Sequence, residues 1–575
     1  MQEEVIGIGK RHPASLNRFV YYPDHLVRMP GPYPSANTVT NIFKNARTLL
    51  SEPIFSGALS GLAAEPTVAL RRPNVQDESV GDFLRRRFGQ TITDNLVSAL
   101  FHGIYAGDLY KLSARTLLPQ AWYLETRDPD GSGVMMEMAD LFLRRVGLFP
   151  YHSLRFRNMT MVAKDGFDAL NDPKSLFLVE GLMTTSVYTF VHGLGVLARR
   201  LETALRSNPN VTIKTSSKVS KVEFRTERER VSIDTDGASA ADEYDYVVSS
   251  LRPGMVQQFR HTSMTSRKAT ADPAVDKACD HVDHAVSVMV VNLYYSNPHL
   301  IPRSLAGFGY LLPRSVPLDQ NPERALGVIF GSETSGLRGS EARQTIPLPS
   351  AEQVEAIRQT MTQHEEFLAG LRREVETDVD QRKNDPKIQE LIHMEEKKAA
   401  NNRKTWDELQ NMMKNKVPRI VAAGQDTAPG TKLTVMLGGH WWDSWTESDL
   451  PGEDQAIEMA KSVLARHLHI TEAPVVAKAR LNRDAIPQYP VHYRQAMATI
   501  HRGLLDEYQG RFKVAGTWWQ GGVGVNDCVR KARETAFAIR EGWDDRTGLE
   551  EYTENEKWCL IDRRTGQAMM DPMCR

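Results

Sequence analysis

The residues of this chain that could do chemistry occur in small, incomplete groups. The four cysteines, Cys279, Cys528, Cys559 and Cys574, lack the CxxC or CxxH spacing of zinc ligands and disulfide frameworks, so we predict no metal site. No Ser-His-Asp set and no pair of carboxylates stands out. The residue types alone therefore predict neither a metal centre nor a set of catalytic side chains.

Two glycine-containing segments could be taken for nucleotide-binding turns. In a dinucleotide fingerprint, a strand leads into G-x-G-x-x-G, and the turn opens a helix whose N–H groups face the pyrophosphate. Residues 5–10 fail this test because His12 stands where the third glycine should be. Residues 187–198 fit strand, turn and helix better, but the strand expected next, 211–214, ends in lysine instead of a ribose-binding acid. We favour a structural strand-helix unit there.

Length and composition restrict the class of protein that positions these groups. The 575 residues suffice for three or four domain-sized units, and 41% hydrophobic with 25% charged residues is typical of soluble globular chains. A formal net charge of -1 gives no overall attraction to nucleic acid, so we predict no nucleic-acid partner. The sequence holds no apolar run long enough for a spanning helix, and its first twenty residues show no targeting signal.

Hydrophobic periodicity predicts a helical first third followed by sheets. Residues 350–417 carry two charged helical patterns around a Pro, which predicts an inserted hairpin with a solvated face. The remaining expected helices are 77–117, with Gly103 and Gly107 as breaks, 135–148, 454–467 and 532–539, and the expected strands are 219–224, 231–233, 246–250, 285–294, 327–330 and 432–437.

Several motifs follow one another in a fixed order along the chain. They are residues 11–21 (RHPASLNRFVY), 77–89 (DESVGDFLRRRFG), 103–108 (GIYAGD) with 112–113, 307–313 (GFGYLLP), 486–489 (IPQY) and 522–528 (GVGVNDC). Together they resemble the oxygen-dependent protoporphyrinogen oxidase family in its eukaryotic, fungal form. The resemblance covers most of residues 1–335 and 430–545, and the hairpin and the tail after Gly548 lie outside it.

The resemblance implies an α/β (α+β) fold of the FAD/NAD(P)-binding, Rossmann-like flavin oxidoreductase type. Family members open with a βαβ unit that carries the glycine fingerprint, and this chain starts after it, so we expect a fold incomplete at the N-terminus, from a truncated start or a fragment. The implied domains are FAD-binding (1–18, 166–255 and 500–548), helical and membrane-associated (19–165), substrate-binding sheet (256–349 and 418–499), inserted hairpin (350–417) and tail (549–575).

The implied activity is oxidation of protoporphyrinogen IX to protoporphyrin IX in haem biosynthesis, with FAD as cofactor and O2 as oxidant. Three two-electron steps would pass hydride to flavin N5 and release three H2O2, so the flavin carries the chemistry and no catalytic side chain is required. The resemblance also implies a homodimer at the mitochondrial inner membrane as a peripheral protein, with ferrochelatase as a further expected contact.

The resemblance assigns four residues to the substrate. Arg18 would hold a propionate through a bidentate contact that lysine could not reproduce. Gly103 would let a helix pass closely along one pyrrole ring. Leu311 and Leu312 would pack on the ring face. His102, beside Gly103, is expected to be a structural histidine.

Four further residues are assigned to the flavin. Val523, Gly524 and Val525 match a turn whose N–H groups, at a helix start, face the pyrimidine end of the isoalloxazine. Val219 matches a position beside the adenine. No clear counterpart is found in residues 331–335 for an aromatic that covers the other ring face in some relatives.

Two alternatives stay open at this point. One is another oxidoreductase of the flavin amine oxidase superfamily, such as an amine oxidase or a carotenoid desaturase, against which Arg18 and residues 103–107 argue. The other is a non-catalytic porphyrin-binding or scaffolding fragment.

Overall fold

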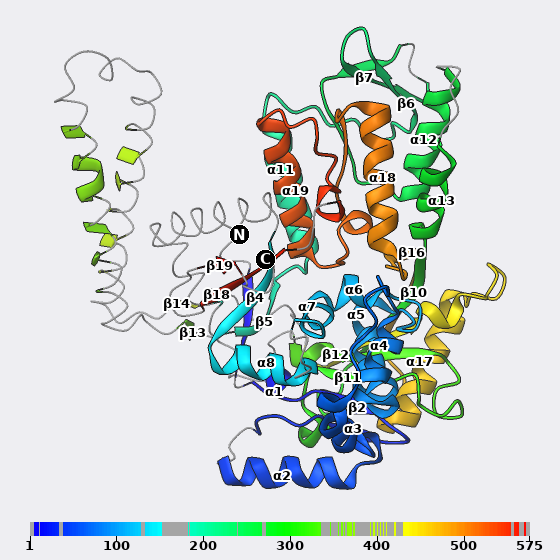
Figure 1. Ribbon diagram of the computed structural model, residues 1–575. Coiled ribbons are helices and arrows are strands. Elements are labelled where there is room, and N and C mark those ends of the chain that lie inside the picture. The colour runs from blue at the N-terminus through cyan, green and yellow to red at the C-terminus, as the bar shows by residue number, and fades with distance from the viewer. Residues whose placement is uncertain are drawn as a thin grey trace.

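A computed structural model gives the arrangement of the chain (Figure 1). The residues that it describes are 5–10, 12–33, 38–127, 133–151, 182, 185–237, 240–266, 272–334, 345–346, scattered positions between 355 and 410, 419–420, 429–553, 557–562 and 568–570. In the view of Figure 1 a helical group with small sheets lies above a larger sheet, and further helices flank that sheet.

A seven-stranded sheet forms the centre of the lower part. Its strands run in the order β16-β10-β15-β12-β11-β2-β3, and every neighbouring pair is antiparallel except β11 with β2. The predictions at 285–294, 327–330 and 432–437 are confirmed. The strands are β2 (Phe19–Tyr21), β3 (Leu26–Arg28), β10 (Ala285–Tyr295), β11 (Gly309–Leu311), β12 (Ala325–Phe330), β15 (Thr431–Gly438) and β16 (Val476–Pro487).

Different helices pack against the two faces of this sheet. Because side chains alternate along a strand, Met289, Val291 and Leu293 of β10 share one face, and all are buried. They belong to the same core cluster as the buried side chains of helix α17 (Glu453–Leu468). Helix α5 (Ser98–Tyr105) contacts β11 and β12.

The first third is helical, as predicted. Two boundaries differ. Helix α5 runs through Gly103 and ends at Tyr105, with Ala106 as its left-handed cap at φ 49°. The helix expected at 135–148 ends at Leu143, and a strand begins at Val146. The elements are α1 (Pro13–Leu16), α2 (Thr38–Ser51), α3 (Ala58–Ala64), α4 (Val80–Phe88), the π-helical turn η4 (Ile92–Val97), α5, α6 (Ala114–Leu117), α7 (Pro119–Leu124) and α8 (Gly133–Leu143).

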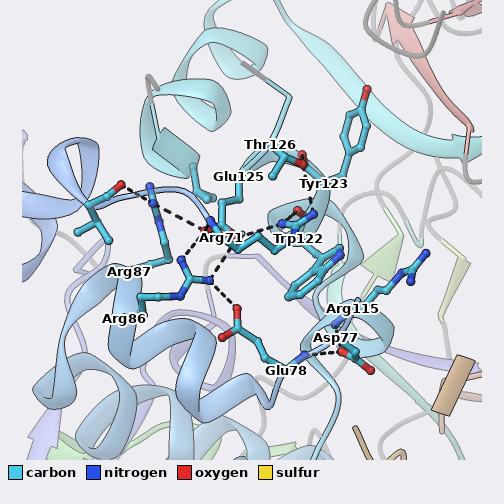
Figure 2. Close-up of polar contacts among 12 residues, drawn as sticks. Arg71, Asp77, Glu78, Arg86, Arg87, Arg115, Trp122, Tyr123, Glu125 and Thr126 are labelled. Carbon is cyan, nitrogen blue, oxygen red and sulfur yellow. Dashed lines mark hydrogen bonds and ion pairs between the residues drawn. The ribbon is translucent and has the colours of Figure 1, made fainter. Parts of the chain in front are cut away.

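Buried ion pairs hold these helices together. Figure 2 shows Glu125 between Arg71 and Arg86, with Nη–Oε distances of 2.9 and 2.5 Å, and Arg86 also pairs with Glu78. Arg87 forms a fully buried pair with Glu65. These contacts join α4 to α7 and to the segment before α4, so the helices of this unit keep fixed positions.

The upper part of Figure 1 combines helices with small sheets. Helices α12 (Pro253–Ser266) and α13 (Pro273–Val282) contact each other, and they pack on β6 and α18 respectively. Both helices therefore lie with the unit expected at 166–255 and 500–548. No strand forms at 211–214, so that prediction is wrong, because the segment finds no ladder partner. The elements are α11 (Gly195–Arg206), β6 (Val219–Arg225), β7 (Arg230–Thr235), β8 (Asp242–Tyr244), β9 (Val247–Ser249), α12 (Pro253–Ser266), α13 (Pro273–Val282), α18 (Tyr493–Tyr508), β17 (Phe512–Val514) and α19 (Val525–Arg540).

The segment at 187–198 folds as the expected strand, turn and helix. Its strand β5 (Thr185–Phe190) pairs with β1 (Val5–Gly9), and Gly193 adopts φ 74° before α11. The pairing is antiparallel. A dinucleotide fingerprint belongs to a parallel βαβ unit, so the structural interpretation of this segment is the better one.

The tail after Gly548 joins the helical first third. Strand β18 (Lys557–Asp562) lies between β19 (Ala568–Met570) and β4 (Val146–Tyr151), and Trp558 stacks on Tyr123 with ring centroids 4.7 Å apart. The sequence patterns predicted neither β4 nor β18.

Most of the expected hairpin, 350–417, lies outside the described residues. The positions described within it are helical, and Arg372 pairs with Glu396 while Arg403 pairs with Glu365. These two pairs link the two segments in an antiparallel sense. Short elements flank the region, namely α14 (Gly331–Thr334), β13 (Thr345–Ile346) and β14 (Arg419–Ile420). No helix among the described residues has the length and apolar character needed to cross a membrane.

Candidate functional site

Helix α5 presents an apolar stripe to open space. Leu100, Gly103 and Ile104 share one face of the helix, because residues three and four apart lie together. Leu100 is 51% exposed and Ile104 45% exposed, whereas Phe101 and His102 are buried. The stripe is therefore available to a ligand.

Gly103 and Leu311 meet at this stripe. A Cβ atom on Gly103 would stand 2.9 Å from Cδ2 of Leu311, and a Cβ atom on Gly327 would stand 2.8 Å from the same methyl carbon. Leu311 thus lies between α5 and β12. The structure brings together two of the four residues expected to contact substrate.

Leu312 differs from the prediction that both leucines contact substrate. Its side chain is fully buried in the core cluster that includes α17, on the other face of the sheet from Leu311. Its carbonyl oxygen lies 2.7 Å from Nδ1 of His102. Leu312 therefore supports the site through packing and its backbone.

Arg18 follows the short helix α1 and lies at the edge of the sheet, next to β2. Its guanidinium donates to the carbonyl oxygens of Ala14 and Asn17 and stacks on Phe308, with Cζ 4.8 Å from the ring centroid. Burial lowers its pKa. Its contacts are two carbonyl oxygens and an aromatic ring, with no carboxylate among the described residues. A half-buried arginine with no acidic partner can receive the carboxylate of a ligand.

Two residues near the site were not predicted. The Arg18 guanidinium lies over the ring of Phe308, and Met436 on β15 pairs in register with Gly327, which itself pairs with Leu311. Phe308 sits in the Gly-Phe-Gly turn that the sequence shows, so its glycine neighbours were an available signal. Met436 lies in an alternating strand, where nothing marks one apolar residue above another.

A cavity of about 440 Å³ opens over the same face of the sheet. Ile329, two residues beyond Gly327, lines it, so the cavity lies on the face that carries Leu311. Asn292, Thr434 and Lys478 also line it. This face therefore offers an apolar strip beside a polar hollow.

The turn before α19 holds three of the residues expected to contact flavin. Gly521 adopts φ 65°, and Gly524 is the N-cap of α19 with its own N–H donating to Asp527 Oδ2 at 3.2 Å. Val525 and Asn526 are exposed, and their backbone N–H groups donate to no partner within the described residues. Free N–H groups at a helix start attract electron-rich oxygen atoms.

Tyr105 connects this turn with the apolar stripe. It lies two residues after Gly103, its carbonyl oxygen accepts a hydrogen bond from Gln488 at 3.0 Å, and its ring packs edge-on against Tyr489. Burial, reinforced by the charge of Asp527, raises the pKa of Tyr105 to about 12. Tyr105 and Val523 pack against the same core cluster, so the end of α5 and the turn before α19 border one core.

Val219 lies farther along the same unit. It begins β6, pairs with Thr235 and packs, like Val523, against the core cluster formed by β6, α13 and α18. The structure thus places Val219 and Val523 on one shared core. Val219 is partly exposed, which leaves it accessible to a ligand.

A buried histidine pair borders the stripe. Nε2 of His102 and Nε2 of His440 are 2.8 Å apart, and the backbone N–H of His440 donates to Ala106 O at 2.8 Å. Burial lowers the pKa of His102 to about 4, and burial with the neighbouring His102 lowers the pKa of His440 to about 3. His102 is structural, as expected, and its partner His440 was not foreseen.

Metal-binding and thiol chemistry find little support in the part of the chain that the structure describes. No three His, Cys, Asp or Glu side chains converge there. Cys279, Cys528 and Cys559 are free thiols, and burial raises the pKa of Cys279 to about 12, which keeps it a thiol.

Comparisons with known proteins point in one direction. The family model described as flavin containing amine oxidoreductase matches residues 7–436. The chain is 23% identical over 539 residues to the protoporphyrinogen oxidase of Schizosaccharomyces pombe, a match that spans 93% of this chain and 81% of that protein. It is 22% identical over 543 residues to the human protoporphyrinogen oxidase, spanning 94% of this chain and 82% of that protein.

A solved structure shows the same fold. The protein is described as a protoporphyrinogen oxidase from Exiguobacterium sp. 255-15, with a TM-score of 0.50 and 15% sequence identity, covering 94% of this chain and 82% of that chain. At this identity the likeness concerns the fold alone.

Proposed function

This chain belongs to the flavin containing amine oxidoreductases, and on that basis we propose that it oxidises protoporphyrinogen IX to protoporphyrin IX with FAD and O2, a step of haem biosynthesis. The protoporphyrinogen oxidases of fission yeast and human, which it resembles over most of its length, support this choice within the family. The observation that carries the proposal is the contact of Gly103 with Leu311, which adds the Leu311 side chain to the exposed apolar stripe of α5 and so makes one apolar wall.

The wall suits a tetrapyrrole. A large apolar ring with few charged substituents needs a wide hydrophobic surface and a small number of polar groups to orient it. Leu100, Gly103, Ile104 and Leu311 supply the surface, and the absence of a Cβ at Gly103 keeps it flat.

Arg18 would orient the substrate. Its guanidinium now rests on two carbonyl oxygens, and a propionate carboxylate offers a stronger, charge-assisted partner. Fixing the ring in one orientation brings its reacting carbon to the cofactor, which is the contribution that protein groups make to such a reaction.

The residues present fit FAD at the start of α19. The unpaired N–H groups of Val525 and Asn526 and the glycines at 521, 522 and 524 leave room and donors for an electron-rich ring edge. We propose Val523, Gly524 and Val525 as its contacts there and Val219 as a contact of its adenine. Bound FAD supplies the two-electron chemistry and transfers the electrons to O2.

The test is a direct assay. The purified chain should carry flavin absorbance, convert colourless protoporphyrinogen into a fluorescent product and consume O2 with formation of H2O2. Flavin-dependent oxidation of simple amines without porphyrin formation would favour another oxidoreductase of the family. Porphyrin binding without flavin would favour the scaffold.

We further propose a peripheral position at the mitochondrial inner membrane. Helix α2 exposes large apolar side chains, among them Phe43 at 72% and Leu50 at 78%, and an exposed apolar helix face can bind a lipid surface. Flotation with liposomes should recover the chain, and Phe43→Ser should reduce the recovery. Flotation unchanged by this substitution would exclude α2 as the contact.

A homodimer, and contact with ferrochelatase, complete the proposal. Both follow from the resemblance to the family. Light scattering of the purified chain tests the first, and co-sedimentation with purified ferrochelatase tests the second.

A further inference from the structure

The pair formed by His102 and His440 has no role in the proposed chemistry, and its contacts are unusual. His102 Nδ1 lies 2.7 Å from the carbonyl oxygen of Leu312, which can only accept a hydrogen bond, so Nδ1 carries the proton. Nε2 of the neutral ring is then an acceptor, and His440 Nε2–H donates to it across 2.8 Å. The two rings form one directed chain of hydrogen bonds.

This chain connects three parts of the site. His102 belongs to α5, Leu312 directly follows Leu311, and His440 lies in the turn η6 (Gly439–Trp442) after β15. The backbone N–H of His440 also donates to Ala106 at the end of α5. The last turn of α5 is therefore tied to two elements.

The ties fix the rotation of α5 about its own axis. His102 and Gly103 are adjacent, so holding His102 on the Leu312 carbonyl directs Gly103 at Leu311. With only about 3 Å between a Cβ position on Gly103 and Leu311, a small rotation would bring Leu100 or Ile104 into the space of the ring.

We propose that His102 and His440 are positioning residues. They fix the distance between Gly103 and Leu311 and therefore the shape of the apolar surface that meets the substrate. The proposal rests on the proposed function, because it concerns the same wall. Neither histidine needs to touch the substrate, and neither exchanges a proton with it.

The experiment compares three variants by porphyrin binding, steady-state kinetics and melting temperature. His440→Leu removes the donor, His440→Gln keeps an N–H donor for His102, and His467→Leu is the control. His467 is also buried, bonded to Tyr310 and to Gln320 O, but it stacks on Tyr21 in the core cluster that includes α17. Binding of protoporphyrin IX is followed by quenching of tryptophan fluorescence, and KM and kcat are measured with protoporphyrinogen.

His440→Leu should weaken porphyrin binding and raise KM by about fivefold or more, the worth of one buried hydrogen bond. His440→Gln should restore most of the affinity. His467→Leu should lower the melting temperature while leaving porphyrin affinity unchanged. This control distinguishes a general loss of stability from a change in the distance between Gly103 and Leu311.

Two outcomes would overturn the inference. Equal porphyrin affinity in His440→Leu and the unchanged chain would exclude positioning by the pair. Equal weakening in His440→Leu and His467→Leu would show a structural effect only. Absence of porphyrin binding by the unchanged chain would reject the proposed function and this inference together, whereas binding without turnover would leave the wall in place and reject the oxidation alone.

Discussion

Gly103 lies so close to Leu311 that a Cβ atom added to the glycine would stand 2.9 Å from Cδ2 of the leucine. This contact joins the helical first third to the seven-stranded sheet at the point where we place the substrate. It also makes the site sensitive to a single methyl group.

Gly103→Ala should raise KM for protoporphyrinogen while changing the free energy of unfolding little, because the clash with the movable end of Leu311 opposes a gain in helix propensity of about 1 kcal/mol. The new methyl group must displace Leu311 or push α5 outward. Steady-state kinetics and thermal unfolding measure the two effects. Gly452→Ala is the matched control, because nothing lies within 4 Å of its Cβ position. An unchanged KM in Gly103→Ala would show that the contact between Gly103 and Leu311 does not belong to the substrate site.

Arg18→Ala should weaken substrate binding by about 1.5 to 3 kcal/mol, the range for a hydrogen bond to a charged group, and KM should rise accordingly. Arg18→Lys should recover only part of this, since an ammonium group cannot bind a carboxylate through two parallel bonds. Arg144→Ala, at an exposed pair with Asp140, serves as the control. Identical KM values for all of these proteins would remove Arg18 from the site.

Glu125→Gln should destabilise the helical unit by about 3 to 5 kcal/mol. Burial alone raises the pKa of this carboxyl group, but hydrogen bonds and charge from Arg86 and Arg71 outweigh it and lower the pKa overall. The amide would leave two partly buried guanidinium groups without their shared anion (Figure 2). Denaturant unfolding measures the loss. Glu458→Gln, at an exposed pair with Lys461, should change the stability little.

The buried histidines predict a dependence of stability on pH. Burial lowers the pKa of His102 to about 4, of His440 to about 3 and of His467 to about 4, compared with about 6.5 in an unfolded chain. As the pH falls below about 6.5, the unfolded chain binds protons that the folded chain does not, so the free energy of unfolding decreases. Each histidine contributes up to about 1.4 kcal/mol per pH unit until its folded pKa is reached.

A variant isolates the contribution of one ring. His467→Gln removes one titrating group, so its free energy of unfolding should fall less steeply between pH 6.5 and 4. The charges of Asp108, Arg314 and Lys111 act on the His102 and His440 pair and stay in place in this variant. Equal slopes for the variant and the unchanged chain would contradict the assigned pKa of His467.

The sequence predicted the central strands well and their edge poorly. Strands 285–294 and 432–437 are rich in branched apolar residues because both lie inside the sheet. Strand β16, at the sheet edge, alternates small and charged residues and leaves most of its side chains at least partly exposed, so no apolar pattern marked it. Pairing between β4 and β18 joins segments about 400 residues apart, which local patterns cannot reveal.

The candidate site shows the same division. Arg18, Gly103 and Leu311 stand in local motifs, and motifs can be read from one sequence. His440 bonds to His102, which lies 338 residues away in the sequence. Phe308 contacts the Arg18 guanidinium only because the sheet brings the two segments together. The resemblance assigned Leu312 to the substrate together with Leu311, but alternation along the chain turns the Leu312 side chain to the other face.

Trp558, stacked on Tyr123, fills a place in the core of the first 150 residues from a position near the end of the chain. During synthesis the amino-terminal helices therefore emerge long before the residue that completes their interior. A growing chain would expose this gap until residue 558 has left the ribosome, and molecular chaperones would have a defined apolar surface to hold for that interval.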